Sequence, residues 1–183
     1  MAYLLDSNVL IDADRDYYPL KRVPEFWDWL IHQSERGVIL TPTEMYNEVV
    51  AGKGVLVDWL KGHRDALVLK DEADPGLVRD VVSQGYAPDL TEDELEKIGN
   101  DPFIVAYALA FEPHATVVST EVSRPSAQRG NRRLPDVCEQ FGLNCINTFK
   151  LVQELNFRTG WRAGQEVAEV DQKADLFSAY GAE

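Results

Sequence analysis

An acid follows directly on a short apolar run at the start of the sequence. Residues 3–5 have the composition of a buried strand, Asp6 stands at its carboxyl end, and Ser7 and Asn8 then open a helix. In α/β sheets, ligands bind at the carboxyl ends of the strands. A carboxylate there, beside a helix N-terminus, is well placed to hold a metal ion. Alternatively, Asp6 only caps the helix that follows, which is a common role of aspartate.

Three further acids occupy comparable places. Glu48 lies two turns into the helix after the second expected strand, Asp101 begins a strongly apolar helix, and Glu121 directly follows a strand. In a parallel sheet these positions converge with Asp6 on one edge. Carboxylates about 5 Å apart, at an effective dielectric of about 20, repel by roughly 3 kcal/mol for each pair. Such a group needs a cation or bound protons, and oxygen-only ligands favour Mg²⁺ or Mn²⁺ over zinc.

Strand and helix signals alternate along the sequence. Strands are expected at residues 3–5, 38–40, 115–118 and 144–146. Helices are expected at residues 9–11, 24–37, 43–52, 55–60, 77–82, from 91, 101–110, from 135, and 148–155. Residues 12–19 are expected to form a polar loop, and residues 66–69 either a short strand or a helix end. This alternation predicts an α/β protein with a parallel sheet covered by helices.

The composition suits a single domain. The sequence has 183 residues, of which 45% are apolar, so it can bury a substantial core. No stretch approaches the roughly 18 apolar residues of a membrane span, and no basic, apolar signal region precedes the first strand, so we expect a cytoplasmic protein. Cys138 and Cys145 fit a reducing compartment and are interpreted as small core residues.

The net charge of −13 argues against a default nucleic-acid binder, because phosphate contacts need Lys and Arg. However, many of the acids lie in exposed-looking runs, at residues 89–94 and 166–183. Arginine is concentrated in one segment, at Arg124, Arg129, Arg132 and Arg133. The local charge around a site therefore matters more than the total.

Four segments in this order resemble the PIN domain of metal-dependent nucleases. They are Leu-Leu-Asp-Ser-Asn-Val-Leu at 4–10, residues 42–48, Asn-Asp-Pro-Phe-Ile-Val-Ala at 100–106, and Val-Val-Ser-Thr-Glu at 117–121. The resemblance implies a PIN-like three-layer α/β fold, with a central, mostly parallel sheet covered by helices on both faces. It implies a nuclease domain over residues 1–158, and residues 159–183 would be an acidic tail that is mobile or bound to a partner.

The resemblance also assigns site roles. The acidic quartet around Mg²⁺ or Mn²⁺ would be Asp6, Glu48, Asp101 and Glu121. The supporting residues would be Ser7, Asn8, Asn100 and Thr120. Glu121 departs from the more common Asp, and it would bind metal through water or act indirectly. Glu44 competes with Glu48, because both lie on one helical face, although the spacing from the strand favours Glu48.

The implied activity is hydrolysis of RNA phosphodiester bonds, leaving a 5′-phosphate, by the toxin of a toxin–antitoxin pair. Residues 133–138 resemble a PIN-like subgroup whose antitoxin partner has a helix-turn-helix DNA-binding domain. The arginines after Glu121 (Arg124, Arg129, Arg132 and Arg133) would grip the RNA, or else form a solvated loop or a patch for an acidic partner. A homodimer is expected, through the apolar helical face at residues 26–31.

Other functions remain open. An aspartate-nucleophile phosphatase would need a second acid where Asn8 stands. A PIN-like interaction module without catalysis fits the negative charge, and a PIN nuclease of RNA processing, or one acting on DNA, fits the same acids. Trp27, Trp29 and Trp59 could stack bases, but their helical spacing is more typical of a core or a dimer surface.

Overall fold

The computed structural model describes residues 1–162 of the 183 and contains a four-stranded sheet. The strands are β1 (Tyr3–Leu5), β2 (Ile39–Leu40), β3 (Thr116–Val118) and β4 (Cys145–Ile146). They lie in the order β2-β1-β3-β4, and every pairing between them is parallel. The predicted α/β class is confirmed.

Helices connect the strands as crossovers. Between β1 and β2 lie α1 (Ser7–Asp12), the wider helical segment η1 (Ala13–Tyr17) and α2 (Pro24–Glu35). Between β2 and β3 lie α3 (Thr43–Val50), α4 (Val55–Gly62), α5 (Arg64–Leu67), α6 (Pro75–Asp80), η2 (Val81–Tyr86), α7 (Glu92–Ile98) and α8 (Asp101–Ala110). The last part holds the short turn η3 (Arg129–Asn131), α9 (Leu134–Gln140) and α10 (Thr148–Glu154).

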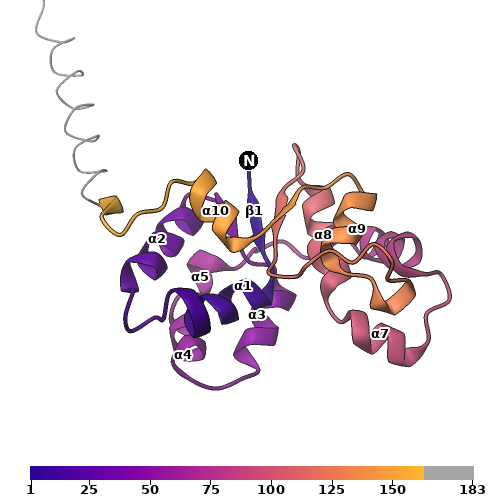
Figure 1. Cartoon of the computed structure of the whole chain (residues 1–183), viewed down its shortest axis with the longest axis horizontal. Coiled ribbons are helices and arrows are strands. Elements are labelled where there is room, and N and C mark those ends of the chain that lie inside the picture. The colour runs from indigo at the N-terminus through magenta and orange to yellow at the C-terminus, as the bar shows by residue number, and fades with distance from the viewer. Residues whose placement is uncertain (163–183) are drawn as a thin grey trace, which may run out of the picture.

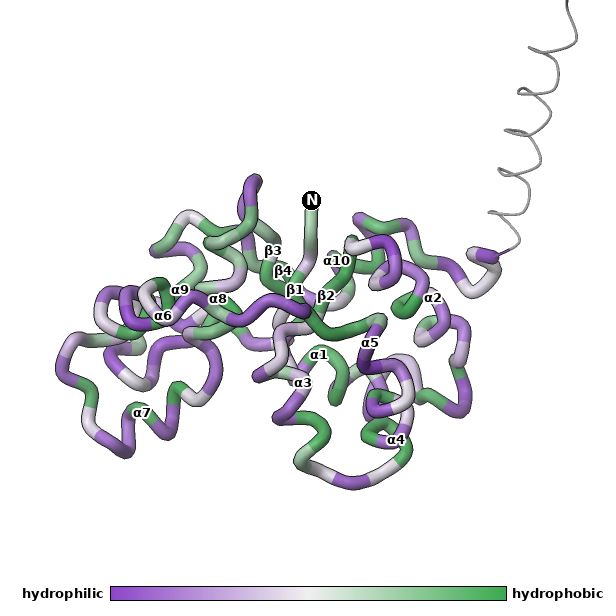
Figure 2. The backbone as a smooth tube through the Cα atoms, turned by 180° about the vertical axis from the view of Figure 1, so that it is seen from behind, coloured by the Kyte–Doolittle hydropathy of each residue, from purple (hydrophilic) through white to green (hydrophobic). Residues whose placement is uncertain are grey.

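The sheet separates two hydrophobic cores. Successive strand side chains point to opposite faces, so the fully buried Leu4 and Leu5 enter different cores. Leu5 packs with residues of α1, α2 and α4, whereas Leu4 packs with residues of α8 and α9. Figure 1 shows β1 between these two groups of helices, and Figure 2 shows hydrophobic segments gathered along the strands. Helices therefore cover both faces, as expected.

Helix α2 begins at Pro24, as predicted from the fit of proline to a first helical turn. Its tryptophans are core residues, since Trp27 and Trp29 are only 1% and 2% exposed. Phe157 covers this helix, with its ring 5.5 Å from that of Phe26 and 5.0 Å from that of Trp29. The apolar face at residues 26–31 is thus used inside the protein, and its assignment as a dimer surface was wrong.

Two segments differ locally from their predicted form. The loop expected at residues 12–19 is largely helical, because η1 extends α1 as far as Tyr17. The Arg15 guanidinium neutralises the acids of this segment, at 2.7 Å from Asp12 and 2.6 Å from Asp16. In the segment at residues 66–69, α5 ends and Val68 then forms an isolated parallel bridge with Thr41. Both alternatives for that segment therefore hold in part.

The described chain continues to pack beyond residue 158. The Trp161 indole N–H donates to the Glu25 carbonyl oxygen at 3.0 Å, and its ring lies 5.0 Å from that of His32. Arg162 pairs with Asp28 at 2.9 Å. Residues 163–183 of the expected acidic tail lie outside the described residues. Within residues 1–162, none of the helices has the length and apolar character needed to cross a membrane.

Candidate active site

Asp6 sits at the carboxyl end of β1 and is only 4% exposed. It occupies the N-cap position of α1, but its side chain makes no capping hydrogen bond. Its carboxylate instead accepts hydrogen bonds from Asn8 Nδ2, from Ser119 Oγ at 2.8 Å and, more weakly, from Ser7 Oγ at 3.4 Å. The buried carboxylate is thus oriented by small polar side chains at the edge of the sheet.

Ser119 is the site residue that the sequence interpretation missed. The parallel register pairs Leu5 with Val118, which places Asp6 and Ser119 side by side where their strands end. The Ser119 hydroxyl, 2% exposed, donates to Asp6 and accepts from Asn8 Nδ2 at 3.3 Å and from the Glu121 amide at 3.1 Å. The signal that could have found it was its position, because it ends β3 as Asp6 ends β1.

Asn8 and Thr120 tie α1 to the end of β3. The Asn8 side-chain oxygen accepts the Thr120 backbone N–H at 3.0 Å. The Thr120 hydroxyl donates to the carboxylate of Asp12, which is not one of the four predicted acids, at 2.6 Å. Asn8 therefore orients the first acid directly, whereas Thr120 positions the loop after β3.

Asp101 begins α8 and lies in the same electrostatic field as Asp6. Burial, followed by the charges of Asp6, Glu121 and Glu48, raises the pKa of Asp101 to about 8. Burial also raises the pKa of Asp6 to about 6, with the charges of Glu48 and Glu121 adding to it and the Ser119 hydrogen bond opposing it. The charges of Glu48 and Glu121 therefore act on both Asp6 and Asp101, and that of Asp6 acts on Asp101.

The Tyr86 hydroxyl donates to Asp101 Oδ2 at 3.4 Å, from the end of η2. This contact is a second one that the sequence did not indicate, because Tyr86 and Asp101 lie on separate helical segments. Burial is the largest cause that raises the pKa of the Tyr86 hydroxyl, and the charge of Asp101 is the next. Tyr86 therefore remains a hydrogen-bond donor at neutral pH.

The geometry places Glu48, rather than Glu44, with the other acids. Asn100 Nδ2 donates to Glu48 Oε1 at 2.7 Å and so connects α3 to the start of α8. The charge of Glu48 raises the pKa values of both Asp6 and Asp101. Glu44 instead faces Tyr107, and its charge raises the pKa of that phenol. Asn100 thus holds one of the acids, in line with its expected supporting position.

Glu121 is held at the start of α9. Its Oε2 accepts the Leu134 backbone N–H at 2.9 Å, and Arg133 Nη1 lies 3.2 Å from its Oε1. The negative charge of Glu121 still raises the pKa values of Asp6 and Asp101. Glu121 therefore contributes charge to the site while its oxygens are engaged by α9.

Two of the four predicted RNA-binding arginines are engaged within the fold. Arg129 pairs with Asp89 at 2.7 Å and with Glu94, the capping residue of α7, at 2.8 Å. Arg132 donates to the Gly85 and Asp136 carbonyl oxygens and to Gln140. These contacts hold the segment after β3 against α7, η2 and α9. Neither side chain is positioned as a free substrate contact.

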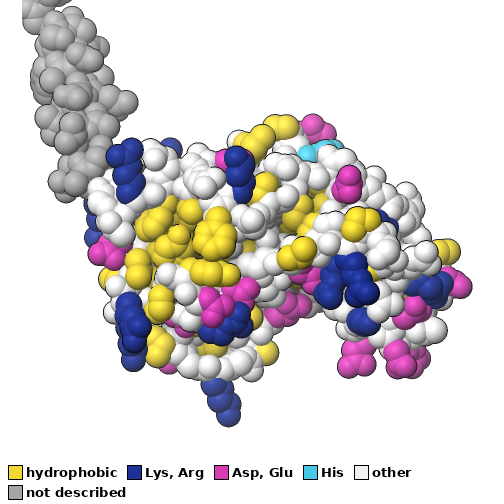
Figure 3. All heavy atoms as spheres, in the orientation of Figure 1, with side chains coloured by type: hydrophobic (Ala, Val, Ile, Leu, Met, Phe, Trp, Pro, Cys, Tyr) yellow, Lys and Arg dark blue, Asp and Glu magenta, His cyan; other side chains and the backbone are white. Residues whose placement is uncertain are grey.

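Arg124 and Arg133 differ from that pair. The Arg124 side chain is exposed, and only its backbone N–H is fixed, by Asp136 Oδ2 at 2.8 Å. Arg133 is also exposed and lies beside Glu121. Figure 3 shows Lys and Arg side chains on the right of the molecule, the side on which Figure 1 places α7, α8 and α9. These two arginines therefore have exposed side chains, and Arg133 lies beside one of the predicted acids.

The donor set fits a hard divalent cation. The clustered groups offer only oxygen ligands, and two of the carboxylates are buried at a net energetic cost that a cation would relieve. Within residues 1–162, no three His, Cys, Asp or Glu side chains already form a group that could hold a metal ion. Glu48 and Glu121 currently direct their oxygens at Asn100, Arg133 and Leu134.

The histidines make their contacts elsewhere, whereas the pKa of Cys138 is raised by the neighbouring Cys145 thiol and by burial, and Cys138 lies close enough to the site for the charges of Asp101 and Asp6 to contribute. His63 and His114 contact backbone carbonyls of their own segments, and His32 lies on Trp161. Cys138 is buried in the core beneath α9, with Cys145 packed against the same core from β4. The cysteines are therefore core residues, as interpreted from the sequence.

Comparison with known proteins gives a family without a described activity. None of the curated proteins matches the sequence. One family model, described as a domain of unknown function (DUF4411), matches residues 3–159. Since that match covers most of the chain, the protein belongs to the DUF4411 family.

Proposed function

We propose that this protein is a PIN-like, Mg²⁺- or Mn²⁺-dependent endoribonuclease. The observation that carries the proposal is that the charges of Glu48 and Glu121 act on both Asp6 and Asp101 at the carboxyl edge of a parallel sheet. Structural carboxylates are normally separated or paired with cations, because their repulsion destabilises the fold. A group of acids with strongly perturbed pKa values is typical of a functional site.

Asp6 and Asp101 are the proposed principal metal ligands, because Asp6 is buried, Asp101 is partly buried, and each ends or begins a regular element beside the sheet edge. Glu48 and Glu121 would join them, directly or through water, by giving up their present hydrogen bonds. A bound divalent ion would stabilise charge on the scissile phosphate and lower the pKa of the attacking water. Asp101, with a pKa of about 8, must release a proton before it can act as a metal ligand.

The other residues at the site would orient the Asp6 carboxylate or bind the RNA. Ser119 and Asn8 hold the Asp6 carboxylate in one orientation through hydrogen bonds. Arg124 and Arg133 would contact phosphates of the RNA on the side of α9. Their positive charge counteracts the acids locally, which is how a chain of net charge −13 could bind a polyanion.

The biological setting is proposed from the sequence resemblance alone. The enzyme would be the cytoplasmic toxin of a toxin–antitoxin pair, held inactive by an antitoxin with a helix-turn-helix DNA-binding domain. It would act as a homodimer, through a surface other than the buried face of α2. Sedimentation of the pure protein tests the dimer, and growth arrest on expression, relieved by the neighbouring gene product, tests the toxin assignment.

The direct test of the activity is cleavage of a defined RNA panel. The wild-type protein should cleave single-stranded RNA with Mg²⁺ or Mn²⁺ and lose that activity in EDTA. Asp6→Asn should reduce the rate by at least about a hundredfold, which corresponds to roughly 3 kcal/mol of transition-state stabilisation. Circular dichroism confirms that the variant is folded. Full activity of Asp6→Asn with metal present would reject this site.

A further inference from the structure

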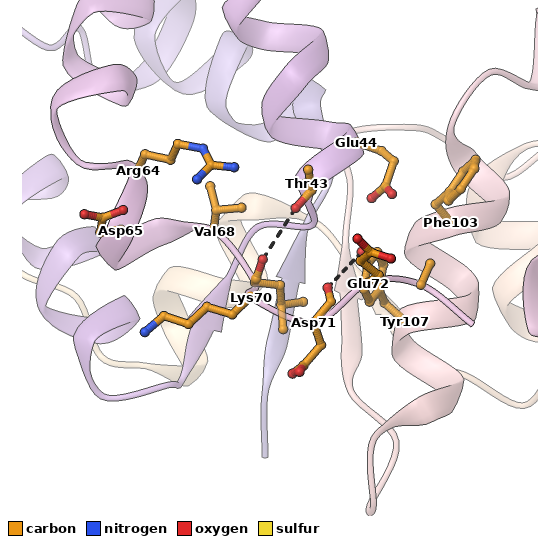
Figure 4. Close-up of a pocket in the computed structure, with 12 residues that line it drawn as sticks. Thr43, Glu44, Arg64, Asp65, Val68, Lys70, Asp71, Glu72, Phe103 and Tyr107 are labelled. Atoms are coloured by element: carbon orange, nitrogen blue, oxygen red, sulfur yellow. Dashed lines mark hydrogen bonds between the residues drawn. The ribbon is translucent and has the colours of Figure 1, made fainter. Parts of the chain in front are cut away.

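A cavity lies outside the acid cluster. It has a volume of about 570 Å³ and opens between the start of α3, the loop after α5 and α8. Asp6, Asp101 and Glu121 do not line it. Figure 4 shows its walls, which combine the Phe103 and Tyr107 rings with the carboxylates of Glu44 and Glu72. A cavity of this size accommodates a side chain or a small molecule.

One end of this cavity is acidic and partly desolvated. Glu44 Oε2 is a buried atom without a hydrogen-bond partner among residues 1–162, and the carboxylate points into the cavity (Figure 4). The Tyr107 hydroxyl donates to the Asp71 carbonyl oxygen at 3.1 Å. Burial, then the charges of Glu44 and Glu72, raise the pKa of Tyr107 to about 12. A side-chain hydrogen bond with Glu44 also contributes to the raised pKa of Tyr107, so Glu44 has only a share of this donor and its Oε2 stays without a partner among residues 1–162. Both carboxylates therefore lie near that hydroxyl.

The basic residues that line the cavity face elsewhere. The Arg64 guanidinium lies 5.6 Å from the centre of the Tyr46 ring, and the Lys70 side chain runs away from Glu44 (Figure 4). In the described part of the chain, neither residue forms an ion pair with Glu44 or Glu72. A buried carboxylate oxygen without a donor is costly, so the site favours a cation supplied from outside.

We propose that this cavity binds the guanidinium group of an arginine side chain from a polypeptide partner. A guanidinium donates hydrogen bonds to a carboxylate and stacks on aromatic rings, which matches Glu44 beside Phe103 and Tyr107. A flat cation with several N–H donors matches a carboxylate beside aromatic rings, and competition with Mn²⁺ in the test below distinguishes it from a metal ion. An arginine within a polypeptide presents only its guanidinium charge, without the α-carboxylate that the exposed Asp65, Asp71 and Glu72 would repel.

The proposal is independent of the nuclease assignment, since the cavity and the acid cluster share none of the predicted acids. The test uses the full chain labelled with ¹⁵N, titrated with N-acetyl-arginine amide and followed by backbone amide shifts. N-acetyl-citrulline amide is the matched neutral probe, with nearly the same shape and no charge. The arginine probe should shift amides at residues 43–46 and 68–73, and the citrulline probe should bind at least tenfold more weakly.

Four variants that each remove one negative charge locate the binding. Glu44→Gln should weaken binding of the arginine probe by at least tenfold, and Glu72→Gln by a smaller factor. Asp65→Asn, at the other end of the same cavity, should leave the affinity within about twofold. Asp6→Asn should also leave it unchanged, which separates this site from the nuclease site.

Three results would overturn the proposal. Equal binding of the citrulline and arginine probes would show that charge is not recognised. An equal loss in Asp65→Asn and Glu44→Gln would show only a diffuse negative field. Displacement of the probe by Mn²⁺, or tighter binding of free L-arginine than of the amide, would assign the cavity to a metal or to a free amino acid.

Discussion

Ser119 lies beside Asp6 across the β1–β3 pair, and its hydroxyl donates a hydrogen bond of 2.8 Å to the Asp6 carboxylate. This hydrogen bond favours the ionised form of a carboxyl whose pKa is otherwise raised by burial and by neighbouring charge. The same hydroxyl accepts the Glu121 amide at 3.1 Å, so it also fixes the chain where the fourth acid begins. One small side chain thus connects the first and fourth acids.

Ser119→Ala should lower kcat for RNA cleavage about tenfold or more while changing KM little, because the serine acts through Asp6 rather than on RNA. Hydrogen bonds to charged groups contribute roughly 1.5–3 kcal/mol. Their loss raises the pKa of Asp6, so the acidic limb of the pH–rate profile should move to higher pH. Ser119→Thr should restore most of the activity.

Ser34→Ala is the matched control, because Ser34 is a buried serine of α2 whose hydroxyl has no partner among residues 1–162. It should leave both kcat and the pH profile unchanged. An unshifted profile in Ser119→Ala would show that the hydrogen bond to Asp6 has no catalytic consequence.

The arginines after β3 should separate into two functional pairs. Arg124→Ala with Arg133→Ala should weaken RNA binding and reduce the slope of log affinity against log salt by about 0.7 for each lost phosphate contact. Arg129→Ala should instead lower the thermal midpoint, because its guanidinium holds Glu94 and Asp89. The measurements are fluorescence anisotropy at several salt concentrations and thermal unfolding. A reduced salt slope in Arg129→Ala would contradict the division.

The acid cluster should make metal-free stability decrease as pH rises. The pKa of Asp101 is raised from 3.8 to about 8 and that of Asp6 to about 6, so the folded state holds protons that the unfolded state releases. Stability contributed by these groups is therefore present below about pH 4 and is lost progressively up to about pH 8. The pKa of Glu94 is instead lowered, from 4.5 to about 2, so the stability that it contributes is lost only as the pH falls through that more acidic range.

Urea unfolding in EDTA at pH 5 and pH 8 measures this effect. The wild-type protein should be less stable at pH 8 than at pH 5, and Asp101→Asn should reduce the difference, because asparagine stays neutral at both. Each unit of pKa shift corresponds to about 1.4 kcal/mol. Addition of Mg²⁺ at pH 8 should restore stability to the wild type. The same pH dependence in both proteins would argue against burial of a protonated Asp101.

Trp161 sets where the chain can be shortened. Truncation after Arg162 should leave the thermal midpoint nearly unchanged and keep or increase RNA affinity at low salt, because the removed residues 163–183 carry a net negative charge. Truncation after Arg158 removes the Trp161 contacts with Glu25 and His32, and stability should fall by about 0.5–1.5 kcal/mol or more. Equal midpoints for the two truncations would show that Trp161 adds nothing to the fold.

The local patterns of the sequence predicted the parts of the fold that depend on neighbouring residues. Asp6 and Asp101 could be placed because each interrupts or begins an apolar run, and parallel strands bring such positions to one edge. Pro24 and the Thr91–Glu94 capping box fixed helix starts for equally local reasons.

Long-range partners could not be predicted in the same way. The role of Ser119 depends on the register of β1 with β3, and that of Tyr86 on how η2 packs against α8. Arg129 and Arg132 were assigned to substrate because a cluster of arginines does not reveal which acids and carbonyls surround it. The apolar face of α2 was assigned to a dimer because Phe157, which covers it, lies far along the chain.

The central claim is that Asp6 and Asp101 hold one divalent cation between them, and Mn²⁺ binding to the full chain tests it most directly. Electron paramagnetic resonance of free Mn²⁺ at pH 8 gives the affinity without any RNA. We predict that Asp6→Asn and Asp101→Asn each bind at least about tenfold more weakly than the wild type, whereas Asp65→Asn and Glu44→Gln bind equally well. Wild-type affinity in Asp6→Asn and Asp101→Asn would contradict the account.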